Sequence, residues 1–381
     1  MNILYICNEY PPSPHGGIGV MVKGLANYFS KNGHNVFILG QYDIDEDLIE
    51  FDNSVKVYRY KNRRYFPSGL SFFNVCQSWL ERKRVHKLIN RVINLDQIDI
   101  VESFDWSGPI INEINIPLVV RLHGSHTANG MYLNNKTSIL LRYFESRTLN
   151  LADHIISISE HTLRITNAVF SLKREISIIN NFVDLDLFFR DKSIMPNKEI
   201  LYVGKYHPNK GMAELFYQIH RILESFEDYS FRFIGNISLT QQKTVLAPMK
   251  SNITDRIFFE GVVEHSKLPF YYNQAKVFIM PSKAEAFGLT TVEAMACGCP
   301  IAMNNTASGP ELIRDGKTGM LIDFNDPKKA TVQLLNFIGD EFKLNSMRMN
   351  CVNEAYNRFS LAQCGMKTLS VYNILLNNQS N

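Results

Sequence analysis

The sequence has no apolar run that approaches the ~20 residues of a membrane-spanning helix, so we expect no such helix. The opening residues MNILYIC lack the basic start and longer apolar core of a signal peptide, and they are typical of a buried strand. The six cysteines, at positions 7, 76, 297, 299, 351 and 364, follow neither the spacing of a disulfide framework nor that of a zinc site. We therefore expect a cytoplasmic chain with free thiols and no metal.

The chain also lacks a strong net charge. Its 40 Lys and Arg and 37 Asp and Glu leave a formal charge of +3, too small to indicate a nucleic-acid partner. The apolar share of 45% and the charged share of 20% are typical of a globular protein. Because 381 residues exceed the size of one ordinary hydrophobic core, we expect two domains.

Positive charge gathers in residues 56–91. This stretch holds ten Lys and Arg but a single acid, Glu81. The aromatic residues interleaved with the cations are Tyr58, Tyr60, Tyr65, Phe66, Phe72, Phe73 and Trp79. One interpretation is a solvated helix face whose aromatic side chains lie in the core. The other is peripheral binding to the anionic surface of the cytoplasmic membrane leaflet.

Short apolar runs alternate with helical patterns through most of the chain, which predicts an α/β protein with doubly wound parallel sheets. We expect strands at 3–7, 35–39, 98–102, 118–122, 154–158, 176–179, 199–203, 230–234, 256–259, 277–280, 300–303 and 320–322. We expect helices at 18–31, 139–152, 212–226, 268–274, 290–296, 328–338 and 355–376, the last interrupted near Phe359. The polar run RDKSIMPNK, starting at Arg190, is typical of a linker between domains 1–190 and 191–360. Such sheets bind ligands at the carboxyl ends of their strands, here facing a central cleft.

The segment 281–300, PSKAEAFGLTTVEAMACGCP, carries the clearest chemistry. It follows an expected strand, and Gly288 allows a tight turn into an expected helix. The backbone amides at this turn lie at a helix N-terminus, where they can bind an anion. These amides belong to Ala286, Phe287, Gly288 and Leu289.

Two carboxylates, Glu285 and Glu293, flank those amides. A carboxylate accepts hydrogen bonds from two neighbouring hydroxyls, so each can hold one sugar ring. We infer that one glutamate holds a sugar and the other a ribose, with phosphates on the amides between them.

A second strand leads into VGKYHPNKG, residues 203–211, which places Lys205 and Lys210 at its carboxyl end. Each lysine is expected to contribute about 1.5–3 kcal/mol through charge-assisted bonds to a phosphate. Fixed cations at this edge of the sheet can bind an anionic ligand there.

The first strand leads into NEYPPSPHGGIG, residues 8–19, where Gly16 and Gly17 let the backbone approach a ligand closely. The loop is too long, and its glycine spacing is wrong, for a dinucleotide fingerprint. Another strand ends in VVRLHG, which places His123 at its carboxyl end, where a ligand is expected.

These segments resemble the signatures of the family 4 retaining glycosyltransferases, which have the GT-B fold. Residues 281–300 resemble P-S-x-x-E-G-F-G-L-x-x-x-E-A-M-A-x-G-x-P, with Ala286 at a position where the family usually has Gly. Residues 203–211 resemble V-G-R-x-x-x-x-K-G, with Lys205 in place of Arg, which keeps the charge but loses the bidentate fork. Weaker matches at 152–160, 180–188 and 308–319 extend the resemblance over nearly the whole chain.

The resemblance implies two Rossmann-like domains, with helix 361–381 crossing back onto the acceptor-binding N-terminal domain. It implies transfer of a sugar from a nucleotide diphosphate sugar to the hydroxyl of a carbohydrate or lipid-linked acceptor, with retention and without metal or other cofactor. It assigns catalytic roles to His123, Lys210 and Glu285, the diphosphate to Lys205 and Lys210, and the ribose to Glu293. Gly16 and Gly17 would contact the donor phosphate or the acceptor. Bacterial surface polysaccharide or glycolipid assembly is the expected setting.

Two D-x-D sequences, 43–45 and 184–186, match the metal motif of the other glycosyltransferase fold. We discount both, because the first lies in an acidic loop and the second belongs to the 180–188 match. Two alternatives stay open: a non-catalytic subunit that binds a nucleotide sugar, and a sugar phosphorylase or epimerase on the same fold.

Overall fold

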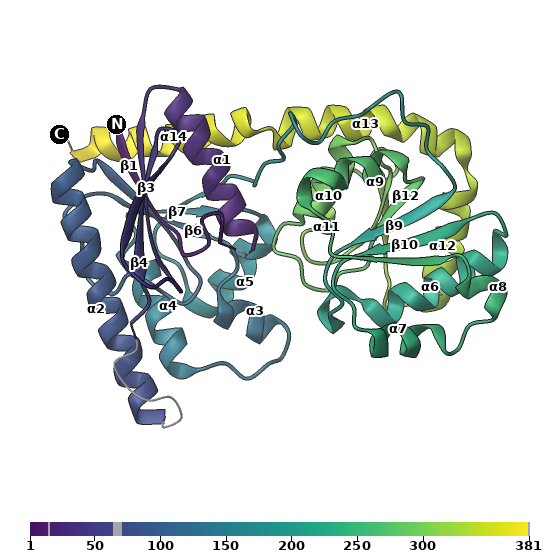
Figure 1. Cartoon of the computed structure of the whole chain (residues 1–381), viewed down its shortest axis with the longest axis horizontal. Coiled ribbons are helices and arrows are strands. Elements are labelled where there is room, and N and C mark those ends of the chain that lie inside the picture. Colours follow the sequence, from purple (N-terminus) through teal and green to yellow (C-terminus); the bar gives the residue numbers. More distant parts are fainter. Residues whose placement is uncertain (14–15, 64–70, 380–381) are drawn as a thin grey trace. The chain divides into compact units, whose positions relative to one another are not determined.

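The computed structural model describes residues 1–13, 16–63 and 71–379, and the chain divides into two compact units. Unit 1 comprises Met1–Asn181 and Leu361–Asn381, and unit 2 comprises Phe182–Ser360 (Figure 1). The division falls earlier than the linker that begins at Arg190.

The segment before the linker belongs to unit 2 because its backbone is bonded there. The Val183 N–H donates to the carbonyl oxygen of Phe359 at 2.8 Å. The side chain of Asn273 donates to the carbonyl oxygen of Phe189 at 2.9 Å.

Unit 1 contains, among the described residues, an eight-stranded sheet in the order β3-β4-β2-β1-β5-β6-β7-β8. Its strands are β1 (Asn2–Ile6), β2 (Asn35–Tyr42), β3 (Leu48–Asp52), β4 (Val55–Lys61), β5 (Ile100–Phe104), β6 (Leu118–Leu122), β7 (His154–Ser157) and β8 (Glu175–Ile178). All pairs are parallel except β3 with β4, so the carboxyl ends of the other strands share one edge.

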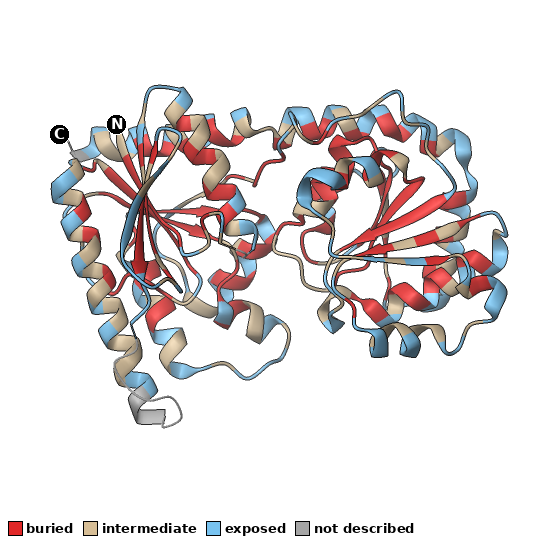
Figure 2. Ribbon diagram, viewed as in Figure 1, coloured by how far each residue is buried: buried red, intermediate tan, exposed pale blue. Residues whose placement is uncertain are grey.

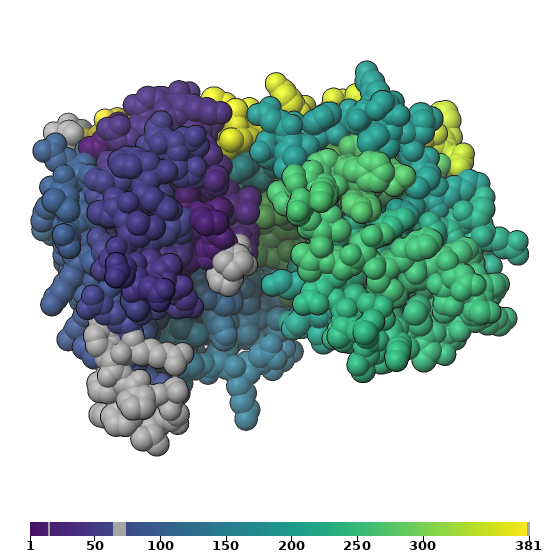
Figure 3. Space-filling view, in the orientation of Figure 1, coloured from purple at the N-terminus to yellow at the C-terminus, as the bar shows by residue number. Residues whose placement is uncertain are grey.

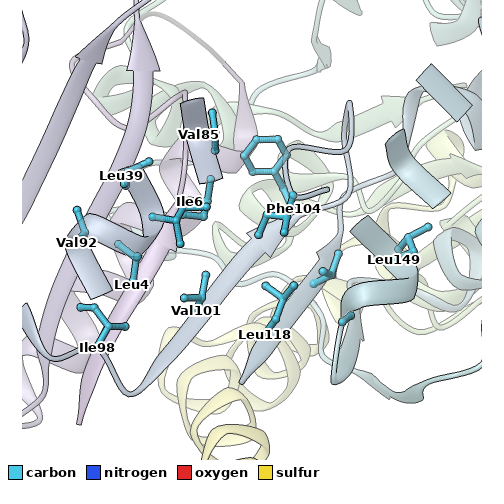
Figure 4. Close-up of a cluster of buried hydrophobic side chains, with 14 of the residues drawn as sticks. Leu4, Ile6, Leu39, Val85, Val92, Ile98, Val101, Phe104, Leu118 and Leu149 are labelled. Carbon is cyan, nitrogen blue, oxygen red and sulfur yellow. The ribbon is translucent and has the colours of Figure 1, made fainter. Parts of the chain in front are cut away.

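The helices of unit 1 are α1 (Gly17–Lys31), α2 (Ser71–Asp96), α3 (His126–Tyr132), α4 (Ile139–Leu151), α5 (Glu160–Phe170) and α14 (Leu361–Gln379). One core cluster lies between the sheet and helices α2 and α4 (Figure 4). In it, Val85 and Val92 of α2 and Leu149 of α4 are packed with Leu4 and Val101 of the strands. Burying one such side chain contributes about 1.5–3 kcal/mol, so this packing stabilises the strand order.

Helix α14 is fixed to unit 1 by a buried polar network. Arg121 of β6 donates to Glu102 of β5 from Nε at 2.7 Å and to Thr368 of α14 from Nη2 at 3.1 Å. The Tyr372 hydroxyl donates to the same Glu102 at 2.6 Å. Removing one member of a buried charged pair costs about 3–5 kcal/mol, so the network stabilises the docking of the last helix.

Unit 2 contains, within its described residues, a parallel six-stranded sheet in the order β11-β10-β9-β12-β13-β14. Its strands are β9 (Glu199–Val203), β10 (Ser230–Ile234), β11 (Ile257–Gly261), β12 (Val277–Met280), β13 (Ile301–Asn304) and β14 (Gly319–Ile322). Its helices are η1 (Pro208–Lys210), α6 (Met212–Ser225), α7 (Leu239–Leu246), α8 (Ser251–Thr254), η2 (His265–Lys267), α9 (Leu268–Gln274), α10 (Leu289–Ala296), α11 (Gly309–Leu312), α12 (Pro327–Gly339) and α13 (Glu341–Phe359). Strands β9 and β12 are buried along their length (Figure 2).

The two sheets, parallel except for the β3–β4 pair, confirm the predicted α/β class, and the expected strands are present with their ends shifted by a few residues. The expected helix 355–376 is two helices, because α13 begins at Glu341 and α14 follows the break at Ser360. Strands β3 and β4 and helices α2, α3, α5, α7, α8 and α11 were not predicted. In β3, Ile49 and Phe51 are 57% and 69% exposed, so its apolar residues mark no buried face. This edge lies on the surface of unit 1 (Figure 3).

The basic aromatic stretch falls on β4 and α2. The rings of Tyr58 and Tyr60 are buried and stacked, and Trp79 packs edge-on against Phe144, which agrees with the core interpretation. Arg64, Tyr65, Phe66 and the side chains of Phe72 and Phe73 lie outside the described residues. Across the described chain, no helix is both long enough and apolar enough to span a bilayer.

Several cations of the stretch form an ion pair or hydrogen bonds within unit 1. Lys56 pairs with Asp96 at 2.8 Å, and Arg82 donates to the carbonyl oxygens of Ser107 and Gly108. The exposed cations on α2 are Lys83, Lys87 and Arg91, which lie four residues apart on one face.

Candidate functional site

Two turns meet at the carboxyl edge of the unit 2 sheet. Strands β9 and β12 are neighbours, so the turns that follow them, 204–211 and 281–288, lie side by side. The Lys283 N–H donates to the carbonyl oxygen of Asn209 at 2.9 Å, which joins the two turns. A Cβ at Gly211 would lie 2.3 Å from the carbonyl oxygen of Pro281, so only glycine permits this approach.

Lys210 and Glu285 form an ion pair across these turns. The Lys210 Nζ lies 2.5 Å from the Glu285 Oε2, and the two side chains are 30% and 16% exposed. The structure thus brings together two residues, predicted separately, that are 75 positions apart in the chain. Each holds the other at the strand edge, where both can turn to a ligand.

Unpaired amides adjoin this ion pair at the start of α10. Gly288 is the N-cap with φ +100°, and the first helical bond is Thr291 N–H to the Gly288 carbonyl oxygen at 3.0 Å. The amides of Gly288, Leu289 and Thr290 therefore have no acceptor among the described residues. They present partial positive charge to an anion.

The turn before α10 is held rigid from behind. The Phe287 ring is buried edge-on against Phe359, with ring centres 5.7 Å apart. The Ser308 hydroxyl donates to the carbonyl oxygen of Phe287 at 2.8 Å. Ala286 and Leu289, on either side, are half-buried. The predicted anion site is therefore ordered by packing in unit 2.

Glu293 is buried, and both its carboxylate oxygens are already bonded. The Tyr272 hydroxyl donates to Oε2 at 3.0 Å, and His265 Nε2 lies 2.8 Å from Oε1. The hydrogen bond to Glu293 raises the pKa of His265, whereas burial raises the pKa of Tyr272 well above its ordinary value. His265 is 48% exposed, so a ligand hydroxyl can take its place on the carboxylate while Tyr272 stays.

Tyr272 and His265 were not predicted from the sequence. Neither belongs to a motif, since one lies on α9 and the other on η2, ahead of the motif segment. The spacing of these residues in the sequence does not indicate their contact with Glu293.

Lys205 lies exposed at the end of β9. The Tyr202 hydroxyl donates to the Lys205 carbonyl oxygen at 3.3 Å, which fixes the backbone there. No residue in the described chain pairs with its ammonium group, which is free for a ligand anion.

The D-x-D sequences have ordinary turn partners. The Asp186 N–H donates to Asp184 at 3.0 Å, and the Asn62 side chain donates to Asp43 at 2.7 Å. Within the described ranges, no three His, Cys, Asp or Glu side chains gather as metal ligands.

The other predicted site residues, Gly16, Gly17 and His123, belong to unit 1. Gly16 caps α1 and Gly17 begins it, and both are exposed. A Cβ on Gly16 would lie 2.9 Å from the Glu9 Oε2, a contact that a small shift of this flexible side chain would relieve. His123 follows β6, and burial lowers its pKa to about 3, so the ring is neutral at pH 7.

Asp105, which follows β5, was not predicted. It is fully buried and accepts the His123 N–H at 2.8 Å, while its Oδ2 has no partner among the described residues. Burial raises the pKa of Asp105 to about 7. The Asp105 carboxylate thus holds the backbone of His123 in place through this hydrogen bond.

We expect Asp105→Asn to remove a pH-dependent loss of stability. Because the folded-state pKa of Asp105 lies above the ordinary 3.8, the native state binds this proton more tightly. The free energy of unfolding should therefore fall as pH rises from about 4 to about 7 by up to about 4 kcal/mol, and the variant should lack this fall. Urea titrations followed by tryptophan fluorescence report on unit 1, which holds both tryptophans.

Asp153→Asn is the matched control, since this exposed aspartate also accepts a backbone N–H, that of Leu118 at 2.8 Å. Equal pH slopes in the wild type and Asp105→Asn would contradict the assignment.

The chain matches known proteins over nearly its full length. Residues 186–358 match the profile of glycosyl transferases group 1, and residues 15–187 match that of glycosyltransferase family 4. An uncharacterized glycosyltransferase of Methanocaldococcus jannaschii is 23% identical over 397 residues, covering 99% of each chain.

Solved structures share the fold. Sucrose-phosphate synthase from Thermosynechococcus elongatus superposes with a TM-score of 0.80 at 17% identity, covering 99% of both chains. The HepE protein of Anabaena, in complex with UDP and glucose, gives a TM-score of 0.69 at 17% identity over 98% of this chain and 100% of that one.

Proposed function

Because the chain belongs to glycosyltransferase family 4, we propose that it transfers a sugar from a nucleotide diphosphate sugar to an acceptor hydroxyl, with retention and without a metal ion. Its fold is the GT-B fold that the sequence resemblance implied. The proposal rests on the Lys210–Glu285 pair, which adjoins the unpaired amides at the start of α10.

The donor diphosphate would bind these amides together with Lys205 and Lys210. The helix N-terminus and two cations supply positive charge where the diphosphate carries its negative charge. Glu285 would accept hydrogen bonds from the transferred sugar and Glu293 from the ribose. The complex of HepE with UDP and glucose supports a nucleotide-sugar donor.

In the proposed reaction, the bond between the anomeric carbon and the diphosphate oxygen breaks as the acceptor oxygen bonds to the same face of that carbon. A donor phosphate oxygen takes the acceptor proton, so charge and atoms balance. Lys210 and the amides stabilise the charge that develops on the leaving diphosphate. His123, neutral at its low pKa, would hydrogen-bond the transferred sugar.

We assign the acceptor to unit 1 and the reaction to surface polysaccharide or glycolipid assembly at the cytoplasmic face of the membrane. The exposed cations Lys83, Lys87 and Arg91 support peripheral contact with an anionic surface. Lys56 and Arg82 do not contribute to this membrane contact, because Lys56 pairs with Asp96 and Arg82 donates to the carbonyl oxygen of Gly108.

A thermal-shift screen with nucleoside diphosphates and nucleotide sugars tests the proposal. A ligand present at 100 times its dissociation constant adds about 2.7 kcal/mol to stability, so the true nucleotide should raise the melting temperature of unit 2. Proton NMR of the product made from that donor should show the donor's anomeric configuration. Stabilisation without turnover under any acceptor condition would favour a non-catalytic subunit, and inversion would refute retention.

A further inference from the structure

A cavity lies entirely in unit 1, apart from the residues assigned to the nucleotide. Its volume is about 790 Å³, within the range of about 300–1,000 Å³ of small-molecule sites. It opens where β1, β2 and β5 end, the edge at which parallel sheets bind ligands. The residues that line it and carry the argument are Glu9, Gln41, Asp43, Glu50, Arg59 and Trp106.

The cavity offers no free positive charge. Arg59 is its one cation among the described lining residues, and each arm of the guanidinium is already bonded. Nε donates to Glu50 at 2.6 Å, Nη1 to the carbonyl oxygen of Tyr10 at 3.0 Å, and Nη2 to that of Pro11 at 2.5 Å. Three carboxylates line the cavity, so it repels a phosphate or carboxylate group.

Hydrogen-bonding groups in the cavity are open to a ligand. The side-chain amide of Gln41 is half-buried and has no partner among the described residues. Asp43 accepts one bond, from Asn62 at 2.7 Å, which leaves its other oxygen for a ligand. Carboxylate and amide groups together accept and donate bonds to neutral hydroxyls.

An aromatic face completes the lining. Trp106 is 43% exposed on the loop after β5. Arg82 holds this loop by donating to the carbonyl oxygens of Ser107 and Gly108, and Glu145 accepts the Ser107 N–H at 3.2 Å. The indole is thus presented on a backbone that is fixed from behind. Such a ring packs against the apolar face of a flat ligand whose edges carry hydroxyls.

We propose that this cavity binds the acceptor, and that the group it binds is an uncharged sugar ring. The ring stacks on Trp106, and Gln41 and Asp43 bond its hydroxyls. This inference rests on the proposed function, and it narrows the acceptor to a saccharide, free or lipid-linked, in place of a lipid phosphate.

A smaller neighbouring cavity of about 330 Å³ shows where a charged extension would go. It shares Gln41 and Asp43 with the first and is lined in addition by Arg63 and Arg82. Arg82 is bonded to the Trp106 loop, whereas Arg63 is exposed. Glu81 and Asp43 line this cavity too, so Arg63 is, among its described lining residues, the one cation that a phosphate elsewhere on the acceptor would meet, outside the sugar-binding cavity.

Saturation-transfer difference NMR on the full chain tests the proposal. The probes are methyl α- and β-pyranosides of glucose, galactose, mannose and N-acetylglucosamine, with farnesyl phosphate as the charged lipid. At least one glycoside should bind with a millimolar dissociation constant. Trp106→Ala should weaken it roughly tenfold, and Gln41→Ala or Asp43→Asn roughly fivefold.

Phe51→Ala is the matched control, because it removes an exposed aromatic ring of unit 1 outside the cavity and should leave glycoside binding unchanged. The proposal is overturned if no glycoside binds the wild type, if Trp106→Ala binds as well as the wild type, or if farnesyl phosphate alone competes for the cavity. The thermal-shift screen separates the two ideas. Nucleotide binding without glycoside binding overturns only this inference, whereas glycoside binding without nucleotide binding overturns only the donor assignment.

Discussion

Glu285→Gln is expected to lower sugar transfer by about 100-fold while nucleoside diphosphate binding stays the same or tightens. The glutamate is proposed to hold the transferred sugar through charge-assisted hydrogen bonds, each of which contributes about 1.5–3 kcal/mol. Losing about 3 kcal/mol of transition-state stabilisation slows the reaction about 100-fold. The diphosphate does not depend on this carboxylate, and the variant frees Lys210 from its partner 2.5 Å away.

The measurement is a steady-state transfer assay combined with calorimetric titration of the nucleoside diphosphate. Glu214→Gln is the matched control, because Glu214 pairs with Lys283 beside the same turn at 2.5 Å and has no proposed role in binding. Glu285→Gln with full transfer activity, or with diphosphate affinity lost in parallel, would show that Glu285 does not hold the sugar.

Lys210→Met is expected to lower transfer by about 100- to 1,000-fold, the effect of removing one group that stabilises developing charge. The substitution keeps the length of the side chain and removes its charge. Negative charge on the diphosphate grows as the sugar leaves, so transfer should fall more than nucleoside diphosphate affinity, which we expect to drop about tenfold.

Single-turnover kinetics and calorimetry on the same samples give the two losses separately. Lys283→Met is the control, since it removes a cation of the adjoining turn whose ammonium pairs with Glu214. Equal losses in affinity and transfer would mean that Lys210 holds the diphosphate only in the ground state.

The strands that carry the candidate donor site were predictable from the sequence. Strands β9 and β12 are short apolar runs buried along their whole length, so their position follows from composition alone. Gly288 marks the turn into α10, because this turn needs a positive φ and glycine is the one residue type that adopts a positive φ freely. Neighbouring strands in a parallel sheet then bring Lys210 and Glu285 together.

The edge of unit 1 was not predictable in the same way. Strand β3 exposes Ile49 and Phe51, so its apolar residues do not mark a buried face. Helix α2 begins beside residues 64–70, which the structure does not describe. Its cations were interpreted as a possible membrane-binding surface, and no helix was assigned to them. A local hydrophobic pattern does not show which strands pair when apolar side chains of one strand are exposed to solvent.

Support residues also escaped the sequence analysis. Asp105 contacts the backbone of His123 because the strands before them, β5 and β6, pair in the sheet. Tyr272 contacts Glu293 because helix α9 packs against helix α10. Neither has a motif of its own. A buried carboxylate with an unpaired oxygen, or a hydroxyl that donates to a buried carboxylate, can be recognised only in the three-dimensional structure.

The central claim is that the cations and free amides of unit 2 bind a diphosphate, and a crystal structure with the most stabilising nucleoside diphosphate tests it most directly. We expect phosphate oxygens within hydrogen-bonding distance of the amides of Gly288–Thr290 and of the ammonium groups of Lys205 and Lys210, with the ribose hydroxyls on Glu293 in place of His265. A nucleotide bound elsewhere, or bound there with both lysines turned away, would contradict it.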